Sequence, residues 1–242
     1  MAANEVDQTR PRWWIEVPVA VLAYQAYRLT RIWVAGSTRN ATIHARQIVR
    51  AERALHIFIE SRSQRALLAH PSVLSFWNVY YGTVHFVVPL VVFVWLWRVA
   101  PDRYRTWRNI FGFLLLIGLI GFAVYPLLPP RLLPPSEHII DTAARFGGLG
   151  SLGGPDANPG NPYAAMPSLH IGWSSWCTAA LVPVLRRRWA RALLVLYPLA
   201  TLTAIVVTGN HYVLDAVGGL LALGAAVGIE QLRSRAAHRA SS

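Results

Sequence analysis

The sequence predicts an all-α, polytopic membrane protein with six transmembrane helices, folded as one integral membrane domain over residues 1–242. Three observations lead to this prediction. Hydrophobic residues make up 54% of the chain and charged residues only 14%, whereas a soluble domain carries about 25% charged residues. Long apolar runs recur at lengths that suit membrane helices, which need about 20 mostly apolar residues. The arginines gather between these runs.

Six apolar segments are predicted to cross the membrane. They are residues 12–36, 72–98, 109–128, 168–186, 190–208 and 211–232. The first segment is the least apolar, because Glu16, Arg28 and Arg31 interrupt it. These charges fall near its ends, where long side chains can extend to the membrane surface.

The distribution of basic residues predicts the orientation. Net charge is +12, and the chain contains arginine but no lysine. Arginines cluster at 98–108, at 186–191 and in a basic tail at 233–242. Short arginine-rich loops remain on the cytoplasmic side, and all three clusters face the cytoplasm if the N-terminus does. Because the charge lies in such loops, we expect no nucleic-acid partner.

Residues 37–71 are predicted to form an interfacial amphipathic segment. Ile43, Ile48 and Leu55 recur at helical spacing among six arginines. This pattern favours a helix on the outer leaflet, with its arginines near lipid phosphates. A solvated helical connector is the alternative.

Residues 129–167 are predicted to form an extracytoplasmic loop between spans 3 and 4. This stretch holds eight of the sixteen prolines, and six glycines lie within 147–160. Such a segment cannot cross hydrocarbon as a helix, because lipid offers its backbone no hydrogen-bond partners.

Two short motifs predict a joint catalytic site. Met-Pro-Ser-Leu-His occupies 166–170, and Asn-His-Tyr-Val-Leu-Asp occupies 210–215. In the predicted topology, His170 and His211 both lie at the extracytoplasmic ends of their spans. Asp215 follows His211 by one helical turn, so its carboxylate can bind one imidazole nitrogen and leave the other as nucleophile. His170 is then the general acid and base of a phosphoryl transfer.

The motifs resemble signatures of the type-2 phosphatidic acid phosphatase superfamily. Pro-Ser-Leu-His at 167–170 resembles the second signature, and the His and Asp of 211–215 resemble the third. Together with Tyr-Pro-x-x-Pro-Pro at 125–130, they look closest to the branch that includes inositol phosphorylceramide synthase-type inositolphosphotransferases. The resemblance covers roughly residues 77–219.

The resemblance implies an enzyme that needs no metal and no cofactor. It assigns the nucleophile to His211, the nucleophile's partner to Asp215, the acid and base to His170, and a phosphate-binding position to Ser168. The implied substrate is a membrane lipid phosphate or polyprenyl phosphate. The oligomeric state is left open.

Two phosphate-binding positions of the superfamily are replaced in this chain. Ile205 stands where the superfamily has an arginine, and Val124 stands where it has a lysine. Arg131 is the predicted replacement, because a guanidinium binds phosphate through two hydrogen bonds; interfacial anchoring is its alternative. Arg145 is a second candidate, and Asn210 is predicted to donate beside the nucleophile.

His85 and Tyr125 are predicted as possible supporting residues around the site. His85 lies in the middle of span 2, where a polar side chain is costly. A buried structural hydrogen bond is therefore the alternative for His85.

The predicted function is a membrane phosphoesterase or phosphotransferase that works through a phosphohistidine intermediate. Water as acceptor gives a phosphatase, whereas an alcohol or sugar hydroxyl gives an inositolphosphotransferase-like enzyme. The site would face the extracytoplasmic side, of the plasma membrane if the source is bacterial. The alternative is a non-catalytic lipid-binding or lipid-transport protein, which would tolerate the loss of His211.

Overall fold

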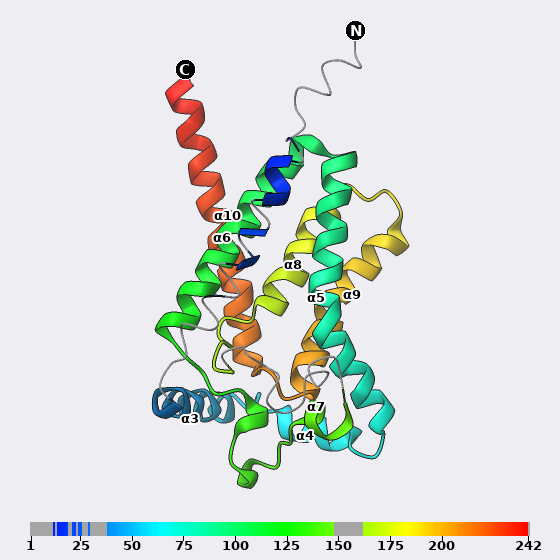
Figure 1. Ribbon diagram of the computed structural model, residues 1–242, viewed down its shortest axis with the longest axis vertical. Helices are drawn as coiled ribbons and strands as arrows, with labels where there is room; N and C mark the ends of the chain where they lie inside the picture. Colours follow the sequence, from blue (N-terminus) through cyan, green and yellow to red (C-terminus); the bar gives the residue numbers. More distant parts are fainter. Residues whose placement is uncertain are drawn as a thin grey trace.

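The computed structural model describes residues 12, 14–18, 21–22, 24–25, 29, 38–147 and 162–241. The regular elements of this part are all helical (Figure 1). Its long helices are α5 (Pro71–Val99), α6 (Pro101–Val124), α9 (Arg188–Val207) and α10 (Val213–Ser241). Each of these four is long and apolar enough to cross a membrane. The predicted all-helical membrane class is therefore confirmed.

The long helices overlap four of the predicted spans, but two of them are longer than predicted. α6 begins at Pro101 rather than at residue 109, so it includes the arginines of the predicted loop. α10 continues to Ser241, so the predicted basic tail is helical and continuous with the sixth predicted span. A helix can extend past the hydrocarbon into water, and hydropathy does not mark its end there.

The other two predicted spans are not established as such. Most of residues 12–36 lies outside the described part of the chain. Residues 168–186 contain α8 (Leu169–Leu181), a helix of 13 residues, which is about 20 Å long against a hydrocarbon core of about 30 Å. α8 is surrounded by α5, α6, α9 and α10, and its Trp176 and Ala180 are fully buried.

The helices place the two motifs at one end of the bundle and the arginine clusters at the other. In Figure 1, α5, α8 and α10 run upward, and α6 and α9 run downward. The arginine-rich stretches 98–108, 186–191 and 233–239 therefore lie towards the upper end. The starts of α8 and α10, which follow the two motifs, lie towards the opposite end.

The predicted interfacial segment forms two helices, α3 (Thr38–Ala54) and α4 (Glu60–Leu67). α3 lies across the lower end of the bundle (Figure 1). Its buried stripe includes Ala41, Ala45 and Ile48, which join a cluster with Leu128 and Tyr212.

The membrane contact expected of this segment stays a prediction. Ile43 and Leu55 of its predicted apolar face are 44% and 60% exposed, whereas the small residues Ala41 and Ala45 face the rest of the protein. The buried stripe of α3 therefore packs on protein rather than on lipid.

The described part of the proline-rich loop is held against α4 and α9. It contains the short helices η1 (Pro130–Leu132), η2 (Pro135–Glu137) and α7 (Thr142–Phe146). Gln64 of α4 donates to the carbonyl of Ile140 and accepts from its N–H. The same amide donates to the carbonyl of Val207 at the end of α9. This contact fixes the loop beside the turn that carries His211.

Candidate functional site

Two histidines and one aspartate from the predicted motifs meet in one hydrogen-bonded row. His211 Nδ1 lies 3.3 Å from Asp215 Oδ2, and His211 Nε2 lies 3.2 Å from His170 Nδ1. His211 is 3% exposed and Asp215 is fully buried. A carboxylate at Nδ1 favours the tautomer that carries its hydrogen there. The lone pair of Nε2 is then directed at His170.

A tight turn between α9 and α10 places His211. Gly209 has a φ of +67°, and an added Cβ would lie 3.3 Å from the Cβ of Arg131, so this position favours glycine. The N–H groups of Asn210 and His211 both donate to the carbonyl of Ile205, at 3.0 and 3.2 Å. His211 therefore sits two residues before α10 begins, rather than inside the helix.

His170 reaches His211 because α8 begins directly against α10. The N–H of Ser168 donates to the carbonyl of Asp215 at 2.9 Å. A Cβ on Gly219 would lie 2.3 Å from the Ser168 carbonyl oxygen, so only glycine permits this approach. The close contact brings residues 41 positions apart in the sequence into one site.

α5 forms an aromatic wall against His170. The ring of Tyr81 stacks on His170 with centroids 4.3 Å apart, and the His85 ring lies 4.2 Å away. His85 in turn stacks on Trp173 at 5.8 Å. His85 was expected as a supporting residue, and it does contact His170. Tyr81 was missed, although its spacing of four from His85 places both side chains on one helix face.

Arg131 and Asn210 lie together beside the histidines. Arg131 Nη1 donates to Asn210 Oδ1, and its backbone N–H donates to the carbonyl of Gly209. Its Nε lies 3.4 Å from Asp141 Oδ2, and Asn210 Nδ2 donates to Thr208 Oγ1. The guanidinium is thus oriented next to the residue that precedes His211.

Ser168 stands at the N-cap of α8 without making the usual capping bond. A serine at this position normally accepts from a backbone N–H of the first turn. Here Ser168 is fully buried, and its Oγ has no hydrogen-bond partner among the described residues. The predicted phosphate-binding role of this hydroxyl stays a prediction.

Three other positions contribute no side chain to this row. The ring of Tyr125 stacks on His44 of α3 at 4.0 Å, and its hydroxyl donates to Gln47. Ile205 is fully buried in an apolar cluster, and Val124 is 74% exposed. Tyr125 thus packs on α3, and neither replaced phosphate-binding position carries a polar side chain.

Sequence reasoning also missed Glu52 and Glu60, both fully buried. Glu52 Oε1 accepts from the N–H of Leu214 at 2.7 Å, and Glu60 Oε1 accepts from that of Val213 at 3.0 Å. A signal existed in the sequence. Glu52 continues the stripe of Ala41, Ala45 and Ile48 at spacings of four, three and four, so a carboxyl falls on the buried face.

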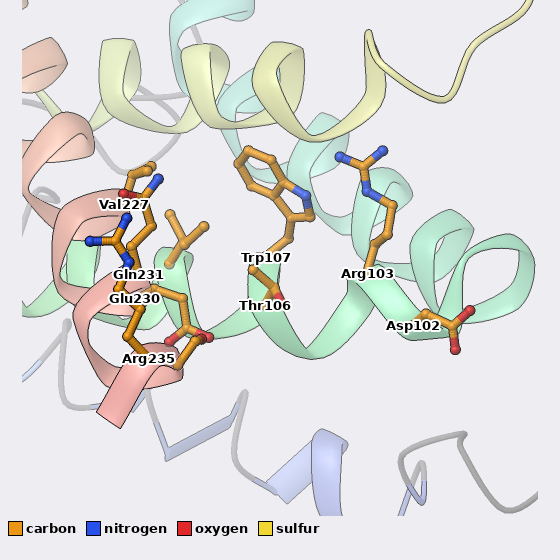
Figure 2. Close-up of a pocket in the computed structure, with 10 residues that line it drawn as sticks. Asp102, Arg103, Thr106, Trp107, Val227, Glu230, Gln231 and Arg235 are labelled. Atoms are coloured by element: carbon orange, nitrogen blue, oxygen red, sulfur yellow. The ribbon is translucent and has the colours of Figure 1, made fainter. Parts of the chain in front are cut away.

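Two cavities differ in position and lining. One of about 610 Å³ lies between α5 and α6, is mostly apolar, and runs from His85 and Trp173 to Arg98 and Arg108. The other, of about 450 Å³, lies between the first turns of α6 and the last turns of α10. Figure 2 shows charged side chains from both helices around this second cavity. The predicted site residues do not line it, whereas His85 lines the first.

Comparison with known proteins gives one family. The model of the PAP2 superfamily matches residues 46–229, which is more than half of the chain and includes both histidine motifs. Searches of curated proteins and of solved structures find no significant match.

Proposed function

The chain belongs to the PAP2 superfamily, and from this premise we propose that it is a membrane phosphotransferase or phosphatase acting on a lipid-linked phosphate. The row Asp215–His211–His170, with contacts of 3.3 and 3.2 Å, carries the proposal. Family membership suggests lipid phosphates as substrates. The row supports a mechanism through phosphohistidine.

In the first step, the lone pair of His211 Nε2 attacks phosphorus. The N–P bond forms as the bond from phosphorus to the leaving oxygen breaks, and His170 gives its proton to that oxygen. Asp215 keeps hold of Nδ1–H and stabilises the positive charge that develops on the imidazole. The products of this step are a phosphorylated His211 and a free alcohol.

In the second step, His170 takes a proton from the acceptor hydroxyl, whose oxygen attacks phosphorus. The N–P bond breaks, and its electron pair returns to Nε2. Water as acceptor releases phosphate from a monoester donor, whereas an alcohol acceptor yields a new phosphate monoester. Neither step requires a metal ion, so we expect activity to survive chelation by EDTA.

The proposed phosphate-binding site consists of Arg131, Asn210 and Ser168. Positive charge and preorganised donors stabilise the equatorial oxygens of a phosphoryl group in transit. Arg131 and Asn210 are already joined by a hydrogen bond, and Ser168 lies at the N-terminus of α8, which attracts anions. These residues would replace the superfamily's missing lysine and arginine.

The apolar cavity supports a lipid as substrate. It borders His85 and Trp173, and the His85 ring lies 4.2 Å from that of His170. Its lining is dominated by aromatic and aliphatic side chains of α5 and α6. A hydrocarbon chain in this cavity would extend into the bundle while its phosphate stays beside His211.

We further propose transfer to a hydroxyl acceptor, as in the inositolphosphotransferase-like branch that the motifs resemble. The test incubates the purified full chain with ³²P-labelled phosphatidic acid and polyprenyl phosphate, with and without inositol, in EDTA. With inositol present, a new labelled inositol phosphate monoester supports transfer, and labelled free phosphate alone supports hydrolysis. Absence of both with every probe, with His211→Ala unchanged in lipid binding, would favour the non-catalytic alternative.

The site is proposed to face the extracytoplasmic side, opposite the arginine clusters. Cys177 is fully buried and is the chain's one cysteine, so Cys177→Ala provides a background for single-cysteine labelling. Ile59→Cys, near α4, should react with a membrane-impermeant maleimide added to whole cells. Trp189→Cys, among the arginines, should react only after lysis. The reverse pattern would overturn the proposed orientation.

A further inference from the structure

Two buried glutamates hold the first turn of α10, and the mechanism above does not use them. Glu52 of α3 and Glu60 of α4, the glutamate pair, accept hydrogen bonds from the N–H groups of Leu214 and Val213. Asp215 Oδ2 accepts from the N–H of Tyr212 at 3.0 Å. Three successive N–H groups at a helix start, which lack partners within the helix, are thus bound by three carboxyl groups.

The charge of this cluster is unbalanced unless a proton is retained. The ion pairs among the described residues include neither member of the glutamate pair. In the part of the chain that the structure describes, no donor group bonds to either Oε2 atom, and both atoms are buried. Two adjacent carboxylates cannot both remain ionised at low cost in a buried site. The two side chains lie in hydrogen-bond contact, and a single proton shared between them removes one charge.

The surroundings favour retention of that proton. Burial and the neighbouring Glu60 raise the pKa of Glu52 to about 9. Burial likewise raises the pKa of Glu60. The negative charge of Asp215 on α10 further raises the pKa of both glutamates.

The remaining charged neighbours do not neutralise the pair. The buried phenol of Tyr212, in the turn before α10, interacts electrostatically with both glutamates and with Glu137 of η2. Glu137 is already paired with Arg53 of α3. His211 is engaged with Asp215 and His170.

We propose that the glutamate pair shares one proton and positions His211, by fixing the first turn of α10. The inference rests on the proposed function only because turnover is used to measure whether His211 is correctly placed. Loss of the proton would place a further negative charge beside Asp215, at the turn that aligns the nucleophile. Both glutamates are then positioning residues that act through α10, without touching the substrate.

The test compares Glu52→Gln, which mimics the protonated acid, with Glu52→Ala, which removes the hydrogen bonds. We expect Glu52→Gln to keep the wild-type kcat at neutral pH and to keep it at alkaline pH, where the wild type declines. Glu52→Ala should lower kcat roughly 10- to 100-fold with little change in KM, because the nucleophile is misplaced. Glu137→Gln is the matched control, and it should follow the wild type.

An infrared measurement observes the proton without any substrate. The wild-type-minus-Glu52→Gln difference spectrum should contain a protonated-carboxyl band at neutral pH that disappears as the pH passes about 9. Absence of that band, or a Glu52→Gln variant as impaired as Glu52→Ala, overturns the inference. If the wild type turns over no lipid phosphate, the proposed function fails, and the infrared result still decides whether the pair holds a proton.

Discussion

The two ends of α10 bury carboxylates in opposite ways. Near its far end, Glu230 is 2% exposed and pairs with Arg233, whose Nε and Nη2 lie 2.7 and 2.8 Å from its oxygens. At its start, Asp215 and the glutamate pair are fully buried. Among the residues that the structure describes, Asp215 alone of the three has a cationic partner, and only when His211 is protonated.

The difference indicates that the region around Glu230 anchors the helix, whereas the start of α10 takes part in the chemistry. An arginine beside Glu230 provides a permanent counter-charge, which suits a helix end that has only to stay in place. At the start of α10, the buried carboxyl groups are stabilised instead by backbone N–H groups, by the helix dipole and by bound protons. Groups that gain and lose protons can take part in catalysis. We therefore expect activity and its pH dependence to be determined at the start of α10.

The largest expected effect on turnover comes from replacing the histidine at the start of α10, compared with replacing one near its other end. His211→Asn should lower kcat by about 10³-fold or more, because the nucleophile is lost while a similar polar volume remains. His238→Asn, in the exposed last turns of α10, is the control and should leave turnover unchanged. Steady-state assays of lipid phosphate turnover measure both. Equal losses of turnover in the two variants would contradict the assignment of catalysis to the start of α10.

A smaller effect is expected from Arg131. Arg131→Ala should lower kcat/KM roughly 10- to 100-fold, the range for a lost hydrogen bond to a charged group. Arg131→Lys should recover only part, because an ammonium cannot form the two parallel bonds of a guanidinium. Arg145→Ala, whose guanidinium lies 5.3 Å above the Phe146 ring, is the matched comparison. If Arg145→Ala lowers kcat/KM more than Arg131→Ala does, phosphate binding has been assigned to the wrong arginine.

The smallest expected effect on turnover at neutral pH is that of Glu52→Gln, which acts instead on stability as a function of pH. Glu52 has a pKa of about 9 in the folded protein against 4.5 when unfolded, so the folded state binds more protons between these values. The stability that this proton contributes is fully present below about pH 4.5 and is lost as the pH rises through about 9.

Thermal unfolding in detergent across this range measures the slope. Glu52→Gln should flatten it, whereas Glu230→Gln, at the other end of α10, should shift Tm by a similar amount at every pH. A slope that Glu52→Gln leaves unchanged would show that the proton resides elsewhere.

The sequence predicted the class of the protein and the pairing of the two motifs. Hydropathy and arginine placement located four long helices, and the spacing of His211 and Asp215 placed their side chains in contact. The ends of α6 and α10 were not predictable, because a helix does not stop where the hydrocarbon stops. The roles of Glu52 and Tyr81 depend on contacts between distant helices. Local spacing can show only which face they share.

The most direct test of the central claim is to trap the covalent intermediate. The purified full chain is mixed with a ³²P-labelled lipid phosphate that it turns over, quenched, and mapped by peptide digestion. We expect an acid-labile, base-stable label on His211, retained longer in His170→Asn and absent in His211→Asn. A label on another residue, or turnover that persists in His211→Asn, would contradict it.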